Sequence, residues 1–207
     1  MNANHDNRDH WIDEALLEEP EKSFVPIQLG TKSSVFLTPD KMILKKTKEK
    51  PLLWRIHPYH AKRFRRMSEL LRQSGHHVPK VFHIQSHRGC SYVVMEYIEG
   101  VPFNQMKAFD EAAFGELKRE IVKLLKNRFY RHDLKFSNFI YASNRVFLID
   151  LDYMLKGFPN RKIQLRMLKR LFRDMNRLTS KEHAAAYVSE IAEKLGIEAI
   201  DFEQVHP

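Results

Sequence analysis

The sequence predicts an α+β fold in which strands dominate the first hundred residues and helices dominate the rest. Short runs rich in β-branched and aromatic residues recur before residue 100, and turn-forming Gly, Pro and Asp residues separate them. After residue 110, apolar residues recur at the spacing of amphipathic helices. With 207 residues, 43% of them hydrophobic, the chain is long enough to bury a core.

Five strands and one helix are predicted in the first half. The strand-like runs are residues 24–29, 34–38, 42–46, 78–83 and 91–96. The helix is expected between the third and fourth strands, from Pro58, which suits a first helical turn, to Ser74. A turn at Arg88-Gly89 joins the last two strands.

The second half is predicted to be mostly helical. Long helices are expected over residues 111–128, 160–178 and 180–195, the last capped by Ser180. A polar segment at 130–138 and two very short strands, 139–141 and 146–149, lie between the first two helices. Short helices are expected at 10–17 and after Gly196. The predicted organisation is an acidic N-terminal arm (1–22), a strand-rich region (23–99) and a helical region (100–207).

The charge distribution is uneven and favours anionic partners. The chain carries 35 Lys and Arg against 26 Asp and Glu, a net charge of +9. Residues 1–22 hold seven acids and two bases, whereas residues 41–66 hold ten bases and one acid, and residues 156–177 hold eight bases and one acid. Such fields attract phosphates in nucleotides, sugars, lipids or nucleic acid, although solvated helix faces explain them equally well.

The composition also bears on localisation. One cysteine excludes an internal disulfide framework and fits a reducing compartment. No apolar run approaches the roughly 18 residues of a membrane span, and the acidic N-terminus is unlike a signal peptide. We therefore expect a cytoplasmic protein.

One constellation of polar residues points to phosphoryl transfer. Residues 131–138 read Arg-His-Asp-Leu-Lys-Phe-Ser-Asn, and Asp150 ends the apolar run Phe-Leu-Ile. One carboxylate can accept a hydroxyl proton, while an amide oxygen and a second carboxylate bind hard cations. A nearby lysine can neutralise charge on a migrating phosphoryl group.

These residues resemble the catalytic and metal loops of the protein-kinase-like superfamily. Asp133, Lys135 and Asn138 fall on the Asp, Lys and Asn of the pattern His-Arg-Asp-Leu-Lys-x-x-Asn, and Asp150 falls on the metal-loop Asp. Upstream, Lys45 closes a Met-Ile-Leu-Lys run that matches the third-strand lysine motif. The segment from Gly30 to Val35 looks like a shortened phosphate loop. Residues 92–100 look like the fifth strand and the hinge that meets adenine, through the backbone of Glu96 and Ile98.

Within the superfamily, the chain is most similar to the bacterial lipopolysaccharide core sugar kinases, which act on 3-deoxy-D-manno-octulosonic acid (Kdo) or heptose. Leu-Ile-Asp-Leu-Asp at 148–152 resembles that family's Ile-Asp-Phe-Asp, and the basic helix at 163–173 resembles its Asn-Leu-Arg-Leu-Leu-Arg-Ser segment. The resemblance implies a two-lobed protein-kinase-like fold, with a small antiparallel-sheet N-lobe containing one helix and a mostly helical, shortened C-lobe.

The same resemblance implies roles and cofactors. ATP and Mg²⁺ are the implied cofactors. Asp133 and Lys135 would be catalytic, Asn138 and Asp150 would hold Mg²⁺, and Gly30, Lys45, Glu96 and Ile98 would bind the nucleotide. The implied acceptor is a lipid-linked or soluble anionic sugar, and a lipid-linked one would bring the protein to the anionic cytoplasmic face of the inner membrane.

Three residues or segments depart from the family pattern. Arg131 stands where the family often has His, and the phosphate loop keeps one glycine, Gly30. The first long helix carries Lys62, Arg63 and Arg65 where a glutamate would pair with Lys45, and Glu69 comes nearly a turn late.

Other functions stay open at this point. The acceptor could be a protein or a small molecule such as an aminoglycoside or choline, and a non-catalytic pseudokinase scaffold is a further alternative. Nucleic acid is a poor candidate, because no zinc-finger, helix-turn-helix or aromatic RNA-binding motif is present. The spacing of His83, His87 and Cys90 suggests zinc only weakly, since the trio spans a hairpin and a fourth ligand is missing.

Overall fold

The computed structural model describes residues 13–49 and 59–197, and these form two compact units. Unit 1 comprises Met1–Glu69 and Pro79–Tyr97, and unit 2 comprises Leu70–Val78 and Ile98–Pro207. Each unit is considered by itself below.

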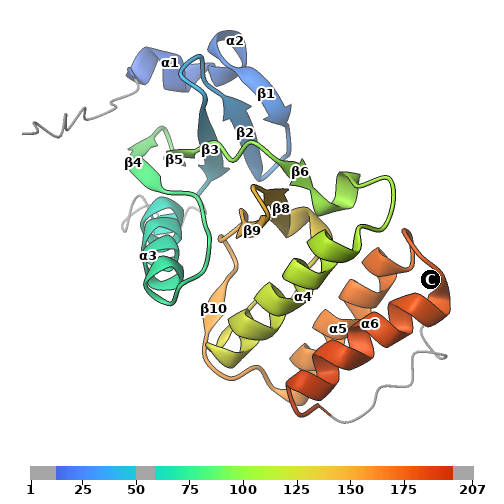
Figure 1. The fold of residues 1–207 in the computed structure, drawn as a ribbon. Coiled ribbons are helices and arrows are strands. Elements are labelled where there is room, and N and C mark those ends of the chain that lie inside the picture. The colour runs from blue at the N-terminus through green and yellow to red at the C-terminus, as the bar shows by residue number, and fades with distance from the viewer. Residues whose placement is uncertain (1–12, 50–58, 198–207) are drawn as a thin grey trace, which may run out of the picture. The chain divides into compact units, whose positions relative to one another are not determined.

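Unit 1 is built on a five-stranded antiparallel sheet (Figure 1). Its strands are β1 (Val25–Gln28), β2 (Ser33–Leu37), β3 (Met42–Lys48), β4 (Val81–His87) and β5 (Cys90–Glu96), in the order β1-β2-β3-β5-β4. A two-residue turn joins β4 to β5, with Arg88 and Gly89 both at positive φ, as a tight hairpin turn requires. Two short helices, α1 (Glu14–Glu18) and α2 (Pro20–Ser23), precede the sheet.

The two faces of this sheet differ, and β3 shows how. Leu44 packs with Phe36, Tyr92 and Val94 of neighbouring strands and with Leu17 of α1. Because side chains alternate along a strand, Lys45 points to the opposite face. There its Nζ lies 5.4 Å from the centre of the Phe64 ring on α3 (Tyr59–Gln73).

Three helices dominate unit 2, and each begins at a side-chain cap. The helices are α4 (Glu111–Lys126), α5 (Arg161–Met175) and α6 (Lys181–Lys194). Asp110, Asn160 and Ser180 each accept a hydrogen bond from a first-turn amide, which satisfies donors that a helix leaves unpaired. α6 packs against both α4 and α5 (Figure 1).

Small strands in unit 2 hold the polar segment that the sequence singled out. β8 (Phe139–Ala142) pairs with β9 (Arg145–Leu148) and with β6 (Val101–Pro102), while β7 (Phe129–Tyr130) pairs with β10 (Leu155–Lys156). The 3₁₀ turns η2 (Phe103–Gln105) and η3 (Phe136–Asn138) lie between them in the chain. Their aromatic rings, Phe103 and Phe136, pack around Phe114 of α4 at centroid distances of 5.2 and 5.5 Å.

The expected α+β fold class is confirmed, with differences at the element boundaries. β4 starts at Val81 and ends at His87, later than the predicted strand at 78–83, and α1 starts at Glu14 rather than residue 10. β6, β7 and β10 have two residues each and were not predicted. Residues 1–12 of the acidic arm, Pro58 and the short helix expected after Gly196 lie outside the described residues, wholly or in part.

Candidate active site

The candidate site in unit 2 is assembled from a loop and the end of a hairpin. The loop runs from β7 to η3 and carries Asp133, Lys135 and Asn138. The β8–β9 hairpin then returns the chain, so that Asp150, two residues beyond β9, lies beside this loop. The Ile149 amide donates to the Asn138 carbonyl at 2.9 Å and fixes the two segments against each other.

Arg131 is the centre of the charged cluster. Its Nε donates to Asp133 Oδ1 at 2.5 Å, and its Nη1 lies 2.8 Å from Asp150 Oδ2 and 2.9 Å from the Asp150 carbonyl oxygen. The Arg131 side chain is 4% exposed, whereas Asp133 is 58% exposed. Burial disfavours the charged guanidinium, but the hydrogen bond to Asp133 and the charge of Asp150 outweigh it, so the pKa of Arg131 is raised above its ordinary value. One fixed cation therefore orients both carboxylates.

Asn138 and Asp150 offer oxygen atoms to a cation. The Asn138 Nδ2 donates to Asp150 Oδ2 at 3.4 Å, and Asn138 Oδ1 accepts from the Lys135 amide at 3.0 Å. The Asn138 amide oxygen has a second lone pair beyond the Lys135 contact. An amide oxygen and a carboxylate are hard ligands of the kind that Mg²⁺ takes in phosphoryl-transfer sites, where waters and phosphate oxygens complete its shell. This donor set fits the metal that the sequence implies.

Asp174 of α5 is a residue that sequence reasoning missed. Its buried Oδ2 accepts a hydrogen bond from the Phe136 amide at 2.9 Å, and Arg170 Nε lies 3.5 Å from its other oxygen. Two contacts at Phe136 thus hold the candidate catalytic loop. The Asp174 carboxylate accepts from the Phe136 backbone amide, and the Phe136 ring packs against Phe114. A lone acid in the basic stretch 156–177 was the available signal. Arg170, within the basic stretch, is half-buried at this contact.

The residues assigned to the nucleotide are divided between the units. Gly30, Lys45 and Glu96 belong to unit 1, and Ile98 to unit 2, where the chain passes from one unit to the other. Lys45 and Lys46 lie on opposite faces of β3, and Lys46 Nζ lies 5.9 Å from the Tyr92 ring. The Glu96 amide already donates to the Lys80 carbonyl at 2.9 Å, so this amide is not available to a ligand.

Gly30 occupies a crowded turn between β1 and β2. A Cβ at this position would lie 2.7 Å from the Ser33 carbonyl oxygen, closer than any ordinary contact. Glycine is therefore required by the turn itself.

No zinc centre forms at the weak histidine and cysteine pattern. Within residues 13–49 and 59–197, no three His, Cys, Asp or Glu side chains converge as metal ligands. His87 instead lies 3.7 and 3.8 Å from Glu14 and Glu18 of α1.

Comparison with solved structures shows the class of fold. The chain is similar to an aminoglycoside phosphotransferase from Streptomyces rimosus, with a TM-score of 0.65 and 15% identity over 94% of this chain and 96% of that one. It is also similar to two structures of the bifunctional kinase-methyltransferase WbdD, at TM-scores of 0.50 and 0.52 and identities of 16% and 17%. The two alignments cover 85% and 86% of this chain. They cover slightly under half of the WbdD chains, 45% and 46%.

The fold is thus that of the kinase-like phosphotransferases, as the sequence predicted. A search of curated protein sequences finds no match. The RIO domain family matches residues 42–189, which is more than half of the chain and includes the whole candidate catalytic loop. The chain belongs to the RIO domain family, and the protein is a phosphotransferase of the kinase type.

Proposed function

We propose that this kinase transfers the γ-phosphoryl group of ATP, with Mg²⁺, to a hydroxyl of an anionic sugar, Kdo or heptose of the lipopolysaccharide core. The observation that carries the proposal is the pair of carboxylates on Arg131. Asp133 is exposed enough to meet an acceptor, and Asp150 lies beside the Asn138 amide that completes a metal-binding pair.

The residues divide the chemistry between them. Asp133 orients the acceptor hydroxyl and takes its proton, while its Oδ1 stays hydrogen-bonded to Arg131. Asn138 and Asp150 would hold Mg²⁺, which supplies charge neutralisation on the phosphates. Lys135 stabilises the transferring group, and Lys45 holds the α- and β-phosphates. The backbone carbonyl of Glu96 and the backbone of Ile98 receive adenine.

Charge favours an anionic sugar over the other small acceptors. One of the similar structures is an aminoglycoside phosphotransferase, so a carbohydrate hydroxyl is an acceptor that this fold accommodates. Aminoglycosides are polycations, however, and this chain carries a net charge of +9, with eight bases in residues 156–177 alone. A cationic acceptor would be repelled, whereas an acidic or phosphorylated sugar would be attracted.

A protein acceptor is the second candidate, because the family match rests on the RIO domain rather than on a sugar kinase. The two candidates share the catalytic residues and differ only in what Asp133 meets.

An acceptor panel separates them. The purified protein would be incubated with ATP and Mg²⁺ and with a Kdo-bearing lipid, a heptose, an aminoglycoside or a mixture of basic and acidic proteins. Mass spectrometry of each acceptor and ADP release are the readouts, and Asp133→Asn is the control. We expect one added phosphate on the sugar, absent with Asp133→Asn. Phosphorylation of proteins alone, or of the aminoglycoside alone, would contradict the sugar assignment.

A further inference from the structure

One end of unit 2 combines an exposed aromatic side chain with exposed positive charge. Phe158 is 75% exposed, the most exposed large hydrophobic side chain among the described residues. It lies between β10 and α5, next to Gly157, whose amide donates to the Arg128 carbonyl at 2.7 Å. A single exposed phenyl ring is common on protein surfaces, so its significance here depends on the positive charge beside it.

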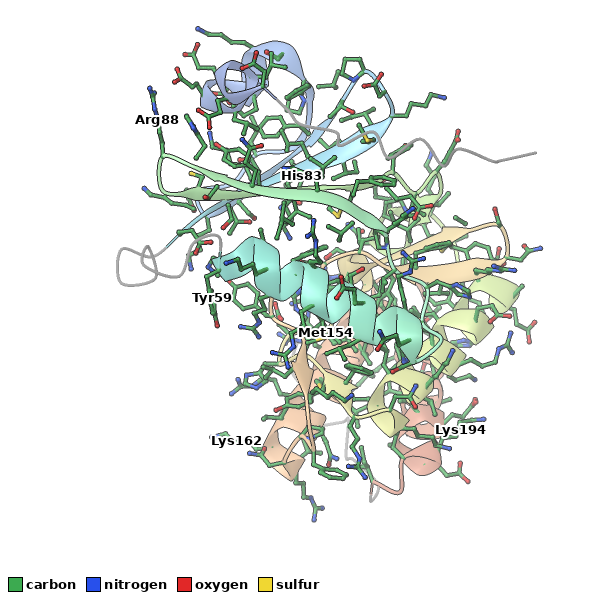
Figure 2. All side chains as sticks on the ribbon, turned by 90° about the vertical axis from the view of Figure 1, so that its left-hand side faces the viewer. Tyr59, His83, Arg88, Met154, Lys162 and Lys194 are labelled. Carbon is green, nitrogen blue, oxygen red and sulfur yellow. The ribbon has the colours of Figure 1, made fainter. Side chains whose placement is uncertain are left out.

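Cations from three helices, one strand and the turn after α4 lie at this end of unit 2. The Arg128 guanidinium lies over the Phe158 ring, 4.2 Å from its centre. Lys126 ends α4 and Lys194 ends α6, Lys156 lies on β10, and Lys162 is in the first turn of α5. All five cations are exposed. Figure 2 shows Lys162 and Lys194 at the same end of the helical unit, below Met154. We call Lys126, Arg128, Lys156, Phe158, Lys162 and Lys194 the basic tip.

The basic tip encloses a hollow of about 260 Å³ with a distinctive lining. Lys126, Arg128 and Lys194 contribute positive charge to it, and its other walls include Phe158, Leu125 and Leu195. None of the described residues that line it is acidic. Such a lining suits a ligand with a negative head and an apolar body.

The conformation of Arg128 is also unusual. It follows the end of α4 with φ at 65°, a left-handed conformation that glycine usually supplies at this position. It is the Arg128 side chain at this position that stacks on Phe158.

We infer that the basic tip docks the protein on an anionic phospholipid surface, with Phe158 inserted at the level of the headgroups and the five cations held against the phosphates. Aromatic residues favour the bilayer interface, and juxtaposed Lys and Arg residues are attracted to anionic lipid. Peripheral docking is consistent with the finding that no described helix is long and apolar enough to cross a bilayer.

This surface deepens the proposed function by supplying a place for a lipid-linked acceptor. Phe158 follows Asp150 by eight positions, so their Cα atoms lie at most about 29 Å apart along an extended chain. The sugar head of a membrane lipid therefore needs to extend no further than that to reach the catalytic loop.

Flotation with vesicles tests the inference directly. The full chain carrying Asp133→Asn would be mixed, without ATP, with zwitterionic vesicles and with vesicles containing phosphatidylglycerol. We expect flotation only with the anionic vesicles, and Phe158→Ser should reduce it about tenfold or more. Lys156→Gln combined with Lys162→Gln should reduce it about 25-fold, since each charge near an anionic surface contributes about fivefold. Because flotation requires no turnover, a failure here is distinct from a failure of the phosphotransfer proposal.

A matched control removes two charges at a distance from the basic tip, one of them at the far end of α6. Lys181 begins α6, exposed, while Lys194 ends it. Lys181→Gln with Lys107→Gln removes two exposed charges away from the basic tip and should leave flotation unchanged. Equal loss in both double variants, or full binding by Phe158→Ser, would overturn the inference. A different result would reassign the basic tip to nucleic acid. In that case the parent protein binds a single-stranded oligonucleotide, the tip variants bind it more weakly, and the parent does not float with anionic vesicles.

A second readout reports insertion itself. In the Phe158→Trp variant, the tryptophan fluorescence should shift to shorter wavelength when anionic vesicles are added, and brominated acyl chains should quench it. The parent protein, measured in the same way, is the reference. An unshifted, unquenched Trp on vesicles that do bind would show that charge alone holds the protein there, and it would overturn the proposed role of Phe158.

Discussion

At the scale of single residues, Arg131 decides how the candidate site is organised. Two carboxylates that face one cation avoid the mutual repulsion they would otherwise experience, and their orientation is fixed by hydrogen bonds at 2.5 and 2.8 Å. The same contacts leave the second Asp133 oxygen, 3.4 Å from Nη2, more weakly held and free to meet a hydroxyl.

Arg131→Gln should therefore separate stability, metal binding and turnover. Removing a buried cation leaves Asp150 and Asp133 uncompensated, and we expect a loss of about 1–3 kcal/mol in the free energy of unfolding. Turnover should fall about tenfold to 100-fold, because Asp133 loses its orientation. The Mg²⁺ concentration needed for nucleotide binding should fall, since the pair becomes more negative.

Arg131→Lys is the matched variant for that experiment. It keeps the charge and loses the fork that reaches both carboxylates. It should retain the parent Mg²⁺ requirement and still lose turnover. If the two variants shift the Mg²⁺ requirement equally, charge at position 131 does not act on the metal site.

Lys45 and Lys46 give a second test at this scale, since they lie next to each other on opposite faces of β3. ATP with Mg²⁺ should raise the melting temperature of the parent protein, because a ligand that binds only the folded state stabilises it. Lys45→Met should remove most of this rise, and Lys46→Met should leave it nearly intact. Differential scanning fluorimetry checks both, and equal effects would mean that the Lys45 assignment is wrong.

At the scale of elements, the hairpin of β8 and β9 positions Asn138 and Asp150, the two residues proposed to hold Mg²⁺. Its packing leaves no room beside Gly100. A Cβ on Gly100 would lie 2.7 Å from Ile140 Cγ2 and 2.8 Å from Ala142 Cβ, both on β8. Gly115, in the middle of α4, has no such neighbour, because the nearest atom is Arg119 Nη1 at 4.0 Å.

The two glycines should respond oppositely to alanine. Gly100→Ala forces β6 from β8 and should lower the free energy of unfolding by about 1–3 kcal/mol. Gly115→Ala replaces a poor helix former and should raise it by about 0.5–1 kcal/mol. Urea denaturation monitored by circular dichroism measures both. If Gly100→Ala leaves the free energy of unfolding unchanged, the contact between β6 and β8 has room for a methyl group.

The sequence alone predicted the elements with a clear hydrophobic period and missed those without one. The long helices and the five strands of unit 1 each repeat often enough to reveal a period, whereas two-residue strands such as β7 cannot. The motif spacing picked out Asp133, Asn138 and Asp150. It could not show that Arg131 contacts an aspartate 19 residues away, or that Asp174 holds a loop 38 residues earlier, because such contacts depend on how separate elements pack.

At the scale of the whole molecule, the proposed chemistry requires both units. The lysine assigned to the phosphates is in unit 1, and the carboxylates assigned to acceptor and metal are in unit 2, while the chain passes between the units three times. The positive charge that favours an anionic acceptor is concentrated in two stretches. Residues 41–66 belong to unit 1, and residues 156–177 belong to unit 2. Activity should consequently depend on residues of both units together.

The most direct test of the account divides the roles of two carboxylates. Asp133→Asn keeps the size of the side chain and removes its ability to accept a proton, so nucleotide binding with Mg²⁺ should survive while kcat falls about 100-fold or more. Asp150→Asn weakens the metal pair, so nucleotide binding in the presence of Mg²⁺ and turnover should fall together, and excess Mg²⁺ should restore part of both. Nucleotide titration with and without Mg²⁺, combined with turnover, measures this on both variants. A fully active Asp133→Asn protein would contradict the proposed mechanism.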